Sequence, residues 1–125
     1  MSQHQKIDYV ELPSNDFDAT RTFYGLVFDF KFDEYGAEYL AFTDQGVDGG
    51  FTRSERSATV DNGSVLVVFY SEDLEETENK ISEAGGIVST PTHSFPGGRR
   101  FHFLDPCGNE LAVWSDLNPD GSACG

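Results

Sequence analysis

Residues 101–114 decide the fold of this chain, and they read FHFLDPCGNELAVW. Two runs of alternating side chains flank an Asp-Pro-Cys-Gly-Asn segment at positions 105–109. Pro106 pre-sets its own φ, and Gly108 can adopt the positive φ that a tight connection needs. The stretch therefore predicts a β-hairpin with a short turn.

The chain also reads as two copies of one unit. When Asp16 is set on Asp73, residue n matches residue n + 57 without a gap. The offset aligns Val10 with Val67, Leu12 with Phe69, Phe17 with Leu74, Thr20 with Thr77, Tyr24 with Ile81 and Val27 with Ala84. Strand, helix cap and helix face all match at this single offset, which favours a repeat covering about residues 6–56 and 64–116.

Each copy is expected to hold one strand, one helix and three short strands. Asp16 and Asp73 are good helix N-caps, Glu76 completes a capping box with Asp73, and Gly85 marks a helix end. A polar stretch at 54–63 is expected to link the copies. Alternating or β-branched runs predict strands at 7–12, 30–35, 38–43, 49–53, 65–70, 87–92, 99–104 and 110–114.

This order of elements, together with the last hairpin, resembles the glyoxalase / bleomycin resistance / extradiol dioxygenase superfamily, also called vicinal oxygen chelate proteins. Phe23-Tyr24 before Val27-Phe28 and the glycine-containing segment 46–50 add to the resemblance. It implies an α+β fold and a single domain over residues 1–125, in which two βαβββ units form paired curled mixed sheets around a cleft. Relatives commonly carry Gly where this chain has Asp29, and Asp tolerates the left-handed region better than most residues.

Period-2 alternation assigns the two faces of each strand. Phe101, Phe103, Leu111 and Val113 are expected under a helix, as are Val10 and Leu12. The opposite face would line the cleft. The residues expected to contact a ligand there are Tyr9, Glu11, Tyr39, Phe51, Leu66, Arg100, His102 and Trp114.

Metal-dependent relatives take ligands from the first and last strands of each unit. The matching positions here are Tyr9, Leu66 and Ala112, with Phe51 or Thr52 for the fourth ligand. Leu and Ala cannot coordinate a divalent ion, which needs three or four N, O or S donors. The cleft is therefore predicted to hold no metal and no cofactor.

Glu11 and His102 are the candidate catalytic residues. Glu11 could act as a desolvated base, or it could simply be solvated or paired with Arg100. His102 could be a general acid or base, or a structural residue within a strand pair. The cleft aromatics could stack on a planar ligand or simply fill the space. Cys107 has no adjacent base in the sequence and is interpreted as an inert surface thiol.

The formal net charge of −14 argues against a nucleic-acid partner and against anionic membranes. No apolar run is long enough to cross a bilayer. Two Cys residues do not make a disulfide framework, so a reducing cytoplasm is the expected location.

The first hypothesis is a metal-independent protein that binds a small molecule, or an enzyme of undefined, lyase-like reaction. The resemblance leaves open a metal-dependent lactoylglutathione lyase-like enzyme or dioxygenase. It also leaves open a drug-sequestering resistance protein, for which the negative charge would favour a cationic ligand. An interaction module without a ligand is a further alternative. The sequence does not distinguish a monomer from a homodimer.

Overall fold

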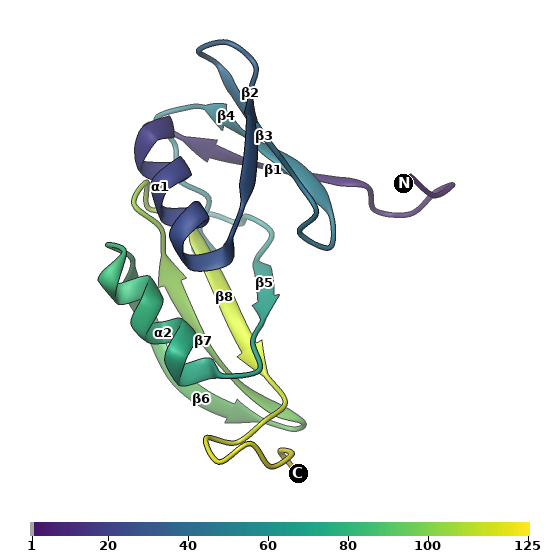
Figure 1. The fold of residues 1–125 in the computed structure, drawn as a ribbon, viewed down its shortest axis with the longest axis vertical. Coiled ribbons are helices and arrows are strands. Elements are labelled where there is room, and N and C mark those ends of the chain that lie inside the picture. The colour runs from purple at the N-terminus through teal and green to yellow at the C-terminus, as the bar shows by residue number, and fades with distance from the viewer. Residues whose placement is uncertain (1) are drawn as a thin grey trace.

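The computed structural model describes residues 2–125 and contains two βαβββ units, each with a four-stranded mixed sheet (Figure 1). The first unit contains β1 (Tyr9–Ser14), α1 (Phe17–Phe28), β2 (Lys31–Glu34), β3 (Tyr39–Thr43) and β4 (Asp48–Arg53). The second contains β5 (Val67–Tyr70), α2 (Leu74–Glu83), β6 (Ile87–Phe95), β7 (Gly98–Leu104) and β8 (Glu110–Ser115). The predicted fold class and order of elements are confirmed.

Both sheets have the same topology. The strand orders are β1-β4-β3-β2 and β5-β8-β7-β6, so the first strand of each unit lies at a sheet edge. It runs parallel to the last strand of its unit, and the other neighbours are antiparallel. In residues 2–125 neither helix has the length and apolarity to span a bilayer.

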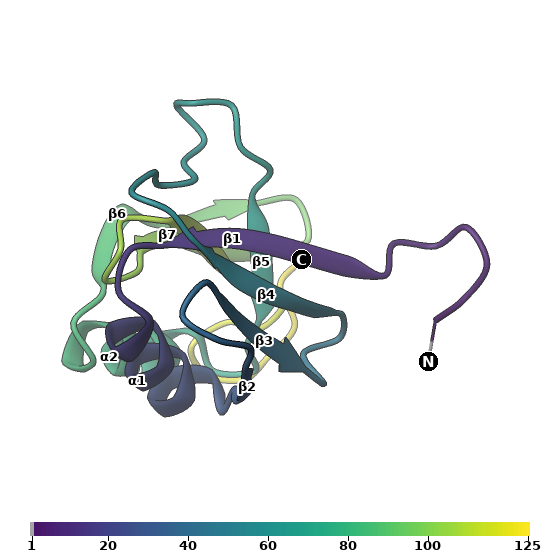
Figure 2. The same ribbon diagram turned by 90° about the horizontal axis from the view of Figure 1, so that it is seen from above.

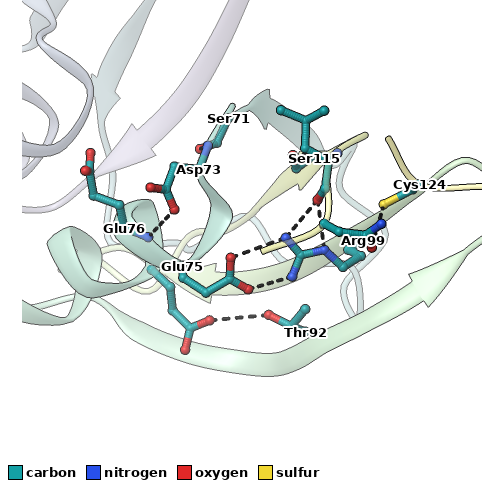
Figure 3. Close-up of polar contacts among 11 residues, drawn as sticks. Ser71, Asp73, Glu75, Glu76, Thr92, Arg99, Ser115 and Cys124 are labelled. Carbon is teal, nitrogen blue, oxygen red and sulfur yellow. Dashed lines mark hydrogen bonds and ion pairs between the residues drawn. The ribbon is translucent and has the colours of Figure 1, made fainter. Parts of the chain in front are cut away.

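The repeat extends to the hydrogen bonds that begin each helix. In the first unit Asp16 caps α1 by accepting from the Ala19 amide, and the Asp16 amide donates to Ser14 Oγ, which also contacts the Thr20 hydroxyl at 2.8 Å. The second unit repeats these contacts with Ser71, Asp73, Glu76 and Thr77. Figure 3 shows the bond from the Glu76 amide to Asp73. The expected capping box is therefore only half correct, because a serine and not Glu76 receives the Asp73 amide.

The first helix ends as its sequence predicts. Asp29 adopts φ +55°, and in this position the Phe30 amide donates a hydrogen bond to the Tyr24 carbonyl at 3.1 Å. An aspartate thus takes the left-handed position that a glycine usually occupies at a helix end.

One aromatic core joins the two units. Both helices lie on one side of the sheets, and the linker that connects the units lies on the other (Figure 2). Phe28 of α1 stacks on Phe69 of β5, with ring centroids 3.8 Å apart and an interplanar angle of 6°. Phe103 of β7 lies 6.0 Å from both Phe23 and Phe28. The two helices and both sheets therefore exclude water from a common interior.

The turn at residues 105–109 holds the units together with polar contacts. Tyr24 donates to Asp105 at 2.8 Å, while Asn109 Nδ2 donates to the Pro13 carbonyl at 2.7 Å and to Asp105 at 3.0 Å. Burial raises the pKa of Asp105, and these donors offset part of that rise. The turn thus connects the two units through buried hydrogen bonds.

Cys107 lies in the same turn. Its side chain is buried beside the hydroxyls of Ser14 and Thr20, at 3.5 and 3.6 Å. The prediction of a surface thiol is therefore wrong, because the second unit's turn packs onto the first helix.

An ion pair between a buried arginine and a half-exposed glutamate ties α2 to the second sheet, and the same arginine binds the C-terminal tail. Arg99 projects from β7 toward the helix side, pairs with Glu75 and donates to the Leu117 carbonyl at 2.8 and 3.1 Å (Figure 3). The hydrogen bond from Arg99 lowers the pKa of Glu75. The guanidinium therefore fixes one helix and the tail at once.

Candidate functional site

The core residues predicted for the last hairpin are confirmed, and one residue predicted for the cleft is not in it. Phe101, Phe103, Leu111 and Val113 are buried in the core, as expected. The prediction that Phe51 contacts a ligand is wrong, because Phe51 is fully buried and the centroid of its ring lies 5.2 Å from that of Tyr24. It is in register with Leu12 and Leu40, and both of those point toward the helix. Phe51 therefore supports the core and does not line a cleft.

A chain of hydroxyls and a carboxylate lies on the open face of the first sheet. Tyr39 donates to Glu11 at 2.8 Å, and the Tyr9 hydroxyl lies 2.7 Å from that of Tyr39. Because Tyr39 has one proton and gives it to Glu11, Tyr9 must donate to Tyr39. Desolvation and these two hydrogen bonds raise the pKa of Tyr39 far above its usual value, so its hydroxyl keeps its proton.

Gly50 allows the hydrogen bonds among Tyr9, Tyr39 and Glu11 to form. Tyr39 is on β3 and Glu11 on β1, and β4 runs between them. A Cβ at Gly50 would meet the Tyr39 hydroxyl oxygen at 2.3 Å, which real Cβ atoms do not approach. The Tyr39 ring thus lies flat across β4 and reaches the carboxylate two strands away.

Glu11 also lines a groove between the two units, which we call the linker groove. Its volume is about 870 Å³. It is bounded by β1, by the linker and by the start of β5. The lining residues are Ile7, Val10, Glu11, Leu12, Pro13, Ser54, Arg56, Ser57, Ala58, Asn62, Ser64, Val65 and Val67. Of the eight residues expected to contact a ligand, Glu11 alone is in this set, and Leu66 lies between two of its members.

Arg100 does not pair with Glu11. In residues 2–125 neither side chain takes part in an ion pair. Arg100 is in register with Trp114 on β8 and with His93 on β6, on the open face of the second sheet. No hydrogen bond, ion pair or aromatic contact joins this face to Glu11 in the part of the chain that the structure describes. The single ligand wall predicted from the sequence is therefore two separate faces.

His102 belongs to the second face and is held by a carboxylate. Its Nδ1 donates to Glu110 at 2.7 Å, and the Val60 amide of the linker donates to the other oxygen at 3.0 Å. The hydrogen bond from His102 lowers the pKa of Glu110. The arrangement fixes the imidazole within the β7–β8 pair and also anchors the linker. His102 does not line the linker groove.

The positions at which metal-dependent relatives carry ligands are poorly suited to a metal. Tyr9 is engaged with Tyr39, and Leu66 has no donor atom. Ala112 is fully buried and in register with Val68. Residues 2–125 contain no group of three His, Cys, Asp or Glu side chains arranged to hold an ion. These side chains do not fit a divalent metal.

Sequence reasoning missed the contribution of the linker. Its residues wall the groove because Ala58 and Val60 are bound to Asn109 and Glu110 of the second sheet. Polar composition alone does not reveal such long-range contacts. It also missed Tyr70, although alternation from Val68 along β5 would have placed Tyr70 on the open face.

Comparisons with known proteins agree with this architecture. The family model described as the glyoxalase/bleomycin resistance protein/dioxygenase superfamily matches residues 6–113. A search of curated proteins finds no match.

Three solved structures illustrate the likeness in fold. A glyoxalase-related enzyme from Fulvimarina pelagi is 20% identical, with a TM-score of 0.72 over 95% of this chain and 96% of that one. A fosfomycin resistance protein from Listeria monocytogenes is 17% identical, with a TM-score of 0.74 over 90% and 94%. A lactoylglutathione lyase from Agrobacterium tumefaciens is 17% identical, with a TM-score of 0.69 over 90% and 95%. With two βαβββ units and a family match across most of its length, the chain belongs to the glyoxalase/bleomycin resistance/dioxygenase superfamily.

Proposed function

We propose that this protein binds a small organic molecule bearing a cationic group, without a metal, in the linker groove. The observation that carries the proposal is the position of Glu11. Glu11 is one of the residues that line the groove, and one of its carboxylate oxygens is held by Tyr39. The other oxygen is left to meet a ligand.

The groove suits a molecule of drug size. Its volume of about 870 Å³ falls within the usual range of small-molecule sites. Val10, Val65 and Val67 supply an apolar wall, and the linker supplies a polar one. The formal net charge of −14 attracts cations toward the protein and repels anions.

A metal-dependent lyase or dioxygenase is the main rival. Such an enzyme would use a Lewis acid to stabilise an enediolate or to activate oxygen. Leu66 and Ala112 remove two of its ligands, which favours the metal-independent reading. An interaction module would not need a charged, partly apolar groove of this size.

Replacing Glu11 with Gln is expected to weaken the binding of primary and quaternary alkylamines by about tenfold or more, since a charge-assisted contact is lost. Isothermal titration of butylamine, phenethylamine and choline against the wild type and Glu11→Gln measures this. Gly50→Ala should produce a similar loss, because it displaces Tyr39 from the carboxylate.

Glu72→Gln is the matched control, since it removes the same charge from an exposed position outside the groove. It should leave amine binding unchanged. Equal affinity of the amines for wild type and Glu11→Gln would contradict the proposal. Tighter binding of carboxylates that have the same carbon skeletons as these amines would contradict it too.

Metal independence has its own test. Protein purified without chelator is expected to contain far less than one equivalent of Zn, Ni, Mn or Fe by elemental analysis. Micromolar additions of these ions should leave the melting temperature unchanged. One tightly held ion per chain, or a large stabilisation by one of the ions, would restore the metal-dependent alternative.

A further inference from the structure

The second sheet carries a cation that has no partner. In residues 2–125 the Arg100 guanidinium makes no ion pair and no hydrogen bond to another side chain. Its neighbour Arg99 points the other way and is bound to Glu75. Acidic side chains are abundant in this chain of net charge −14, yet none in residues 2–125 is paired with Arg100.

Arg100 lies in a row of side chains that crosses all four strands. The register places Tyr70 of β5 beside Trp114 of β8, Trp114 beside Arg100 of β7, and Arg100 beside His93 of β6. Register partners point to the same face of a sheet and lie within reach of one another. The row therefore presents two aromatic rings at one end, and the Arg100 guanidinium and the His93 imidazole at the other.

The indole of Trp114 is fixed in place within this row. Its centroid lies 5.2 Å from that of Tyr70, at an interplanar angle of 65°, and 6.4 Å from that of Phe95. A Cβ at Gly98 would meet the indole at 3.1 Å, so the ring rests against a strand that has no side chain there. Tyr70 is 50% exposed and Phe95 is 37% exposed, which leaves an aromatic surface open to solvent.

Two acidic groups near the row are already engaged. Glu110 is held by His102 and by the Val60 amide. Asp116 accepts from the Tyr70 hydroxyl at 2.6 Å. The row thus offers a stacking surface and a free guanidinium, and neither acid is bonded to Arg100.

We propose that this face is a second binding site, which takes a planar aromatic anion such as an aryl carboxylate. The ring would lie against Trp114, and the carboxylate would pair with Arg100. Arginine matches a carboxylate with two parallel N–H groups, and an aromatic ring gains further stabilisation from offset or edge contacts. The site is independent of the linker groove, because Glu11 and Arg100 lie on different sheets.

The experiment uses the single tryptophan of the chain as its probe. Benzoate is titrated into ¹⁵N-labelled protein, and the one indole N–H signal is followed by NMR. Benzyl alcohol has the ring without the charge, and cyclohexanecarboxylate has the charge without the planar ring. Benzoate is expected to shift the indole signal saturably and to bind at least about tenfold more tightly than either analogue.

Variants separate the two sites. Arg100→Gln should weaken benzoate by about tenfold or more and leave benzyl alcohol unchanged, because only the charged contact is removed. Lys80→Gln, which removes a positive charge from an exposed position of α2, is the control and should leave benzoate binding unaltered. Glu11→Gln should also leave it unaltered, so this site and the proposed amine site succeed or fail separately.

Three outcomes would overturn the proposal. They are an indole signal that does not respond to benzoate, equal binding of benzoate and cyclohexanecarboxylate, and equal benzoate affinity in wild type and Arg100→Gln. Light scattering on the same samples tests whether a second copy of the protein occupies this face instead. A homodimer in which a second copy covers Trp114 would show the row to be a subunit contact and would likewise overturn it.

Discussion

Truncating Phe103 to Ala is expected to lower the free energy of unfolding by about 3–5 kcal/mol, the range for a large buried aromatic. Phe103 is fully buried and lies near Phe23 and Phe28 of the first unit as well as Phe69 of the second. The cavity would therefore open where the two units meet, and neither unit could close it alone. Urea unfolding followed by circular dichroism gives the value.

Leu26→Ala is the control, since this leucine projects into solvent from α1 and its loss should cost under about 0.5 kcal/mol. Leu111→Ala should cost about 2–5 kcal/mol. Trp114→Phe should cost less than Leu111→Ala, because the indole is on the open face. If Trp114→Phe were the more damaging change, the assignment of faces in the last hairpin would be reversed.

Replacing Asn109 with Ala is expected to cost about 2–4 kcal/mol, because it leaves buried polar groups without partners. Asn109 is fully buried. Its Oδ1 accepts from the Ala58 amide at 2.8 Å, and its Nδ2 donates to the Pro13 carbonyl and to Asp105. One side chain thus connects the first strand, the linker and the turn.

Thermal and urea unfolding of Asn109→Ala measure the loss, with Asn79→Ala on the exposed side of α2 as the matched control. The control should change stability by less than about 0.5 kcal/mol. The linker should also become more accessible to proteolysis in Asn109→Ala, since its Ala58 anchor is lost. Wild-type stability in this variant would show that the network does not hold the units together.

The elements were predictable because the signals for them are local. Asp16 and Asp73 cap their helices, Asp29 takes the left-handed position, and the 105–109 segment turns between β7 and β8. Each depends on residues within one or two turns of chain. The predicted repeat appears as matching topology and matching helix-start hydrogen bonds.

The candidate site was less predictable because it depends on how sheets and linker pack. Phe51 was misplaced because β4 carries adjacent glycines, which leave no alternation to follow. Arg100 was expected near Glu11 because a single cleft was assumed, whereas the two residues are on different sheets. Cys107 is buried only because its turn packs on α1.

The stacked pair Phe28 and Phe69 has a consequence for the order in which the protein folds. These residues are far apart in the chain, and the first is at the end of a helix that precedes three strands. Contacts between distant residues form late, because the intervening chain loses entropy when they close. During synthesis the first unit would therefore present Phe28 to solvent until β5 emerges from the ribosome. Although the sequence repeats itself, its halves share one aromatic core, so we expect neither half to be stable until both are complete.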